Sequence, residues 1–174
     1  MLANPLRLRV LDAVRGSGPL FVSDVAARCG LTISHASQIL RALESRGLLT
    51  SRRRGARVLY VLDPGGALPG HRPLAVALQR ELAVAAADYR TIVWKLTAFT
   101  HPRRVAVVQA IARGTHARSG VGAAGRMSQT ALQRNLSKLK RRGVLDESDG
   151  ALHVLKPASP LAAALLSFAL TTTA

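Results

Sequence analysis

The amino-acid sequence predicts a mainly α-helical protein with small β-hairpins, built from two similar units in tandem that a long central helix joins. Three observations lead to this fold class. Apolar residues recur at helical spacing along most of the chain, and a pair of short β-favouring runs follows the third helix of each half. In addition, residues after 100 repeat the pattern before 64. The predicted parts are a first domain (1–72), a connecting helix (73–99) and a second domain (100–174).

Two helices open the first unit. An apolar stripe that includes Leu6, Val10 and Val14 predicts the first helix, which the turn Gly16–Pro19 closes. A second, shorter helix follows, for which Ser23 is the expected N-cap and Gly30 the left-handed end.

A third helix begins after Thr32 and ends before Gly47. A short helix, a turn and a second capped helix constitute a helix-turn-helix. The outward side of the later helix carries polar groups that reach base edges and phosphates when such a helix lies in a major groove. These candidate DNA contacts are Thr32, Ser34, His35, Ser37, Gln38 and Arg41. The alternative is an ordinary polar face of an amphipathic helix.

The next two runs, at 48–51 and 58–62, predict a β-hairpin around a Gly-bearing turn. Arg52, Arg53, Arg54 and Arg57 are expected at its tip, in contact with the phosphate backbone or an adjacent minor groove. A hairpin in this place is a wing, and the unit is then a winged helix-turn-helix.

Residues 3–64 resemble the winged-helix core of ArsR/SmtB-like bacterial transcription repressors. The motifs that carry the resemblance are Leu2–Leu11, Val22–Ala26, Ser34–Leu48 and Gly55–Tyr60. The resemblance implies a DNA-binding repressor that is usually dimeric and is often released by a ligand or a metal.

The usual metal site of that family is not expected here. Metal-sensing members place cysteines in the helix that corresponds to Ser23–Arg28, but the matching positions are Phe21 and Ser23. No Cys/His cluster elsewhere replaces the thiolates, so we expect no metal and no cofactor. Cys29 is most simply a small buried residue, with a redox switch as the alternative.

The central stretch Pro73–Phe99 contains no Gly or Pro after its first residue, and its apolar residues follow helical spacing. We expect one continuous helix of roughly 39 Å, close to the ~34 Å between half-sites one DNA turn apart. It would then set the spacing of the two heads. Its apolar seam would be buried within one chain, as a pseudo-dimer, or against a second copy, as a homodimer.

The second half repeats the first at an offset of 96 to 97 residues, with His101-Pro102 matching Asn4-Pro5 and Gly143 matching Gly47. The predicted second recognition helix starts at Ser128. Its candidate DNA contacts are Ser128, Gln129, Thr130, Gln133, Arg134 and Lys138. Its hairpin carries Asp146, Glu147 and Asp149, which are expected to repel phosphate, so the second unit contacts DNA through its helix or binds a protein instead.

Charge favours a polyanionic partner. The chain has 25 Lys+Arg and 9 Asp+Glu, a net charge of +16, of which 1–72 carries +7 and 100–174 carries +8. The single cysteine and the absence of an apolar leader favour a cytoplasmic location, and no run suits a membrane span. The five histidines are scattered and no phosphate loop or nucleophile elbow occurs, which argues against an enzyme.

The sequence therefore predicts a sequence-specific regulator of transcription, most simply a repressor, that binds double-stranded DNA. A protein-interaction scaffold and a non-specific architectural DNA-binding protein are the alternatives. A small-molecule effector is open: Tyr89 and Trp94 could line a pocket, or could simply be core residues.

Overall fold

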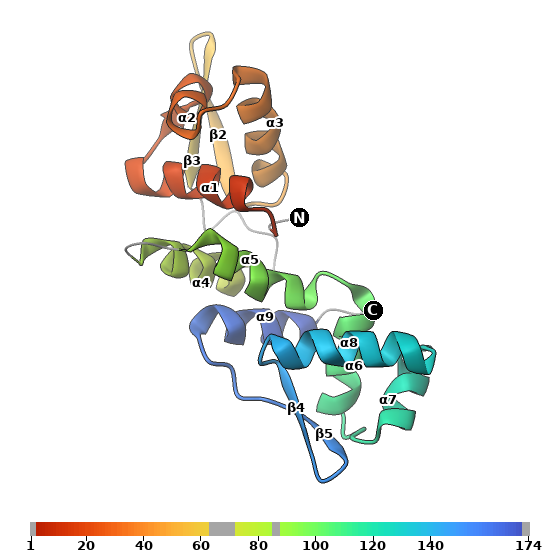
Figure 1. The fold of residues 1–174 in the computed structure, drawn as a ribbon. Coiled ribbons are helices and arrows are strands. Elements are labelled where there is room, and N and C mark those ends of the chain that lie inside the picture. The colour runs from red at the N-terminus through yellow and green to blue at the C-terminus, as the bar shows by residue number, and fades with distance from the viewer. Residues whose placement is uncertain (1–2, 63–71, 85–87, 172–174) are drawn as a thin grey trace. The chain divides into compact units, whose positions relative to one another are not determined.

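The computed structural model describes residues 3–62, 72–84 and 88–171 (Figure 1). The chain divides into two compact units, Leu2–Val93 and Trp94–Ala174. The boundary falls inside one helix.

The first unit follows the predicted order of three helices and a hairpin (Figure 1). Its elements are α1 (Pro5–Ser17), β1 (Leu20–Phe21), α2 (Val22–Cys29), α3 (Ile33–Glu44), β2 (Leu49–Arg54), β3 (Arg57–Leu62), α4 (Arg72–Ala83) and α5 (Tyr89–Leu96), the last of which crosses the boundary. The strands form one antiparallel sheet in the order β1-β3-β2, with Leu20 opposite Tyr60 and Arg54 opposite Arg57. The predicted hairpin is confirmed. The strand β1 was not predicted, because a strand of two residues leaves no recognisable pattern in the sequence.

Local chemistry accounts for the helix ends. The Asn4 side chain accepts bonds from the first backbone amides of α1, and Thr32 does the same for α3. Gly30 ends α2 in the left-handed conformation, as predicted. The expected cap at Ser23 is wrong, because β1 delivers the chain to the helix at Phe21 and Ser23 already lies in the first turn. There the Asp24 carboxylate accepts from the Phe21 amide at 3.0 Å.

The core of this unit lies where α1 packs against α3, α4 and the hairpin. Leucines dominate it and fill the space between these helices and the sheet. The fully buried ones are Leu8, Leu11, Leu40, Leu43, Leu49, Leu78 and Leu82.

The prediction of one continuous central helix is wrong. α4 ends at Ala83, Val84 is a bend, and α5 begins at Tyr89. Asp88 explains the new start, since its carboxylate accepts bonds from the Arg90 amide (2.9 Å) and the Thr91 hydroxyl (2.6 Å). Aspartate favours this capping role over a helix interior. The predicted spacing rule, which required a rigid 39 Å rod, therefore falls with the helix.

After the end of α5, the second unit also has three helices, a hairpin and a further helix, but its described residues contain no strand that corresponds to β1 (Figure 1). They are η1 (Thr97–Phe99), α6 (Pro102–Ala112), α7 (Arg118–Ala124), α8 (Gln129–Arg141), β4 (Leu145–Ser148), β5 (Ala151–Val154) and α9 (Pro160–Thr171). The two strands pair antiparallel, with Glu147 opposite Leu152. His101 caps α6 by accepting from the Arg103 amide at 3.2 Å.

One arginine is part of the interior of this unit. Arg104 is only 7% exposed, and its guanidinium donates to the carbonyls of Ala98 and Thr97, each at 2.8 Å, and to the Thr100 hydroxyl at 3.0 Å. Burial lowers its pKa. Through these bonds Arg104 holds the turn at η1 to α6.

In the part of the chain that the structure describes, no helix is both long and apolar enough to cross a bilayer.

Candidate nucleic-acid interface

The polar face of α3 is open to solvent in the first unit. Ser34, His35, Gln38 and Arg41 are exposed, while Ser37 is half-buried. Thr32 is exposed too, but its hydroxyl oxygen accepts from the His35 amide at 3.2 Å and so serves the helix end. The inner face of α3 is buried, which leaves the outer face as the side available to a partner.

Three hairpin arginines extend this polar surface. Arg52, Arg53 and Arg54 lie on β2 and are all exposed. Successive side chains of a strand point to opposite faces, so Arg52 and Arg54 share one face and Arg53 points to the other. A duplex on one face of the hairpin would therefore meet Arg52 and Arg54, and a duplex on the other face would meet Arg53.

Arg57 differs from the sequence-based expectation. Its guanidinium lies 3.6 Å from the centroid of the Phe21 ring and donates to the Ser23 hydroxyl at 3.2 Å. Asp24 is 3.9 Å away. A cation over an aromatic face is held electrostatically, so Arg57 fastens the hairpin to the start of α2 instead of projecting from the tip.

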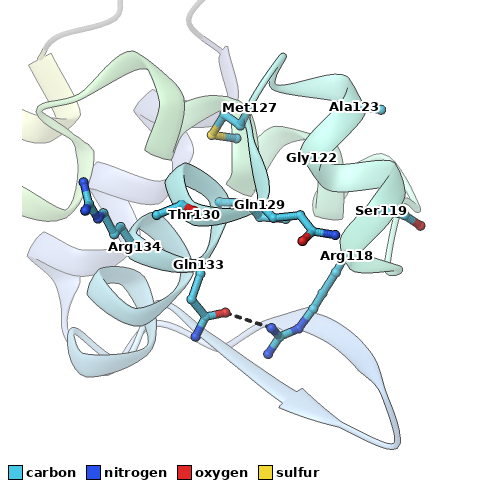
Figure 2. A pocket seen from close by; sticks show the side chains of 10 residues that line it. Arg118, Ser119, Gly122, Ala123, Met127, Gln129, Thr130, Gln133 and Arg134 are labelled. Atoms are coloured by element: carbon cyan, nitrogen blue, oxygen red, sulfur yellow. Dashed lines mark hydrogen bonds between the residues drawn. The ribbon is translucent and has the colours of Figure 1, made fainter.

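The equivalent face of the second unit is hollowed. A groove of about 780 Å³ runs between α7 and the first turns of α8, and four predicted contacts line it: Gln129, Thr130, Gln133 and Arg134 (Figure 2). Ser128 caps α8 through a bond from the Ala131 amide at 3.3 Å, and Lys138 is exposed farther along the helix. The structure thus gathers the first four on one surface and leaves Ser128 with a role at the helix end.

Arg118 is the residue of this groove that sequence reasoning missed. It stands at the first position of α7, and its Nη1 donates to Oε1 of Gln133 at 2.8 Å (Figure 2). Its Nε and Nη2 each bond one carboxylate oxygen of Glu147 at 2.5 Å. The sequence contains one hint: Arg118 and Glu147 are charged, whereas Val22 and Ser51 stand at the corresponding positions of the first half.

Glu147 is consequently not the free acid that the sequence predicts. Lys140 adds a third contact, with Nζ 2.5 Å from Oε2 of Glu147. The hydrogen bonds from Arg118 and Lys140 lower the pKa of Glu147 to about 2. Because two cations neutralise this carboxylate, the expected repulsion of phosphate is left to Asp146 and Asp149, which are exposed.

The aromatic residues considered for an effector pocket have structural partners. The Tyr89 hydroxyl donates to Asp12 at 2.7 Å, and the Arg142 guanidinium lies 4.1 Å from the centroid of the Trp94 ring. A separate apolar cavity of about 170 Å³ exists in the second unit, between η1, the end of β5 and α9, with Phe99, Val144 and Leu165 in its walls.

Within residues 3–62, 72–84 and 88–171, no three His, Cys, Asp or Glu side chains come together as a metal site. Cys29 is buried, and burial raises the pKa of its thiol, which keeps it protonated and poorly nucleophilic.

Comparison with known proteins adds the family context of the first unit. Residues 2–52 match the model of a helix-turn-helix domain. The chain is similar to two proteins of Mycobacterium tuberculosis: it is 41% identical over 61 residues to the HTH-type transcriptional regulator NmtR and 41% identical over 59 residues to the HTH-type transcriptional regulator Rv0324.

These similarities cover 35% and 34% of this chain, and 50% and 26% of the two relatives. The chain thus spans half or less of the curated relatives it matches. No solved structure matches it. The helix-turn-helix is supported for the first unit, and its neighbours in sequence are regulators of transcription.

Proposed function

We propose that this protein is a sequence-specific regulator of transcription, acting as a repressor, that binds double-stranded DNA through two winged-helix heads. The observation that carries the proposal is the exposed polar face of α3 together with the exposed Arg52, Arg53 and Arg54 on the hairpin of the same unit. A helix of this kind fits a major groove, and arginines next to it neutralise phosphates.

The second head is proposed from parallel construction. α7 and α8 repeat the order of α2 and α3, and the polar residues of α8 line an open groove. Its hairpin, with Asp146 and Asp149 exposed, is expected to stay away from phosphate. This head therefore uses its helix, while the first head uses both helix and hairpin.

Fluorescence anisotropy with labelled duplexes tests the proposal. Genomic fragments that the protein selects are expected to bind with nanomolar affinity, about 10³-fold or more tighter than random duplex at the same salt concentration. Equal affinity for selected and random DNA would identify the non-specific architectural binder and would contradict sequence-specific regulation.

A protein-interaction scaffold is the competing function, and the exposed acids of the second hairpin favour it. Replacing Arg52, Arg53 and Arg54 together by Ala separates the two functions. A matched control replaces three exposed arginines of α4 and α5 by Ala: Arg72, Arg80 and Arg90. DNA binding through the hairpin requires that the first triple weaken affinity far more than the second, whereas equal effects favour the scaffold.

Oligomeric state and effector belong to the same proposal. Two heads in one chain form a pseudo-dimer, and a homodimer would present four heads to the operator. Light scattering of the protein, free and with the selected duplex, distinguishes these assemblies. A small-molecule effector that releases DNA stays a prediction.

A further inference from the structure

A row of four bonded side chains, Lys140, Glu147, Arg118 and Gln133, lies at the α7–α8 groove, and the last two of them line it. Arg118 on α7 stands between Glu147 on β4 and Gln133 on α8. Glu147 takes two of its nitrogens, and Lys140 holds the carboxylate from the other side. The Arg118 guanidinium is thus held between Glu147 and Gln133, and Glu147 is held between Arg118 and Lys140.

This contact fixes which way the Gln133 amide faces. A guanidinium has only N–H donors, so the Gln133 atom that meets it at 2.8 Å must be the carbonyl oxygen. The amide nitrogen, which carries two N–H donors, then points away from Arg118 (Figure 2). The usual ambiguity of a glutamine amide is removed by the chemistry of its partner.

A glutamine with a fixed amide reads DNA differently from a free one. A free glutamine pairs with adenine by accepting from N6 and donating to N7, and needs its oxygen for that purpose. The major-groove edge of guanine instead offers two acceptors, N7 and O6. The outward amide nitrogen, with its two N–H donors, matches guanine, whereas the oxygen, although it keeps a second lone pair, is turned toward Arg118 and away from the base.

We propose that Arg118, held by Glu147, is a positioning residue that makes Gln133 of the second head select guanine over adenine. This inference rests on the proposed DNA-binding function and names the base that one of its residues reads. The first unit lacks the device, since Val22, Ser37 and Ser51 stand at the positions that correspond to Arg118, Gln133 and Glu147.

The ionisation of Glu147 helps to keep the hydrogen bonds of this row in place. Because the pKa of Glu147 is lowered to about 2, its carboxylate stays ionised throughout the pH range in which DNA binding is measured. Charged partners make the shorter and stronger hydrogen bonds.

The first experiment examines the contact without DNA, by NMR of the full chain. The side-chain amide signals of Gln133 are assigned with Gln133→Ala and compared in Arg118→Met and in Arg113→Met, which removes another exposed charge of the same unit. Arg118→Met should move these signals toward those of a free glutamine, and Arg113→Met should leave them in place. If the signals do not move in Arg118→Met, the proposed positioning of Gln133 by Arg118 is wrong, independently of whether the protein binds DNA.

The second experiment selects duplexes from a random library with each variant. Wild type and Arg113→Met should prefer guanine over adenine about tenfold at the position that Gln133→Ala makes indifferent. Arg118→Met should lose that preference while still binding the rest of the site. An unchanged preference in Arg118→Met, or no position affected by Gln133→Ala, overturns the inference. Wild type that selects no site at all contradicts the proposed function instead.

Circular dichroism melts show whether each variant is folded, and a cooperative transition is expected for each. If Arg118→Met is unfolded, Glu147→Gln replaces it: the loss of the carboxylate charge frees Arg118 and should weaken the guanine preference in the same direction. Retention of the full preference in a folded Glu147→Gln variant overturns the role of Glu147.

Discussion

Tyr89 shows how a single hydroxyl group ties distant parts of the first unit together. It donates to Asp12, 77 positions earlier, and the same carboxylate accepts from Arg15 at 2.7 Å. Burial and the neighbouring Asp12 charge raise the pKa of Tyr89 to about 12, from 10. The neutral hydroxyl is therefore the form that the folded state favours.

Tyr89→Phe should lower the free energy of unfolding by about 1 to 2 kcal/mol, because a hydrogen bond to a charged acceptor is lost. The raised folded-state pKa makes this contribution full below pH 10 and removes it as the pH rises toward 12. Urea denaturation at pH 7 and at increasing pH measures both effects. A double-mutant cycle with Asp12→Asn is the control, and strictly additive losses would show that the two groups do not interact.

At the scale of the element, α8 is fastened at its end by Arg142. Its guanidinium donates to the Trp94 carbonyl at 3.2 Å and to the Thr97 hydroxyl at 2.9 Å, and it stacks on the Trp94 ring. The guanidinium has two roles: it bonds the Trp94 carbonyl near the end of α5 and it covers the face of the Trp94 ring.

Arg142→Ala should cost about 1 to 2 kcal/mol of stability, and Arg142→Lys should recover little of it, since an ammonium lacks the planar fork. Arg141→Ala is the matched control: Arg141 is exposed, carries the same charge, and makes one long bond of 3.4 Å within its own helix. Thermal melts of the three variants measure the difference. Equal losses for Arg141→Ala and Arg142→Ala would refute a specific role of the α5 contact.

At the scale of the whole molecule, the net charge of +16 should dominate the energetics of DNA binding. If six to ten phosphates are neutralised, affinity should fall by roughly 10³ to 10⁵ between 50 and 200 mM salt. Anisotropy titrations over that range give the slope. A nearly flat dependence would mean that the basic surface does not face the nucleic acid.

Much of the fold follows from local sequence rules. Thr32, Gly30 and Ser128 mark helix ends, because capping depends on a few adjacent residues. The central helix was mispredicted because apolar spacing continues through Asp88, whose carboxylate starts a new helix.

For the candidate site, the candidate residues of α3 and α8 other than the half-buried Ser37 are exposed, but their pairing did not follow from the sequence. Arg57 and Arg118 are ordinary surface arginines in the sequence, and only the fold brings them to Phe21 and to Glu147. Contacts across 29 or more positions depend on the packing of the unit as a whole. Whether the residues of α3 and α8 bind DNA stays a prediction.

The two hairpin fastenings also have opposite polarity, which bears on folding fidelity. In the first unit the hairpin supplies the cation, Arg57, to α2; in the second the helix α7 supplies Arg118 to a hairpin carboxylate. A hairpin that docked on the wrong unit would bring Arg57 against Arg118, or Asp24 against Glu147. Both exchanges would oppose like charges, which disfavours the docking of either hairpin on the wrong unit.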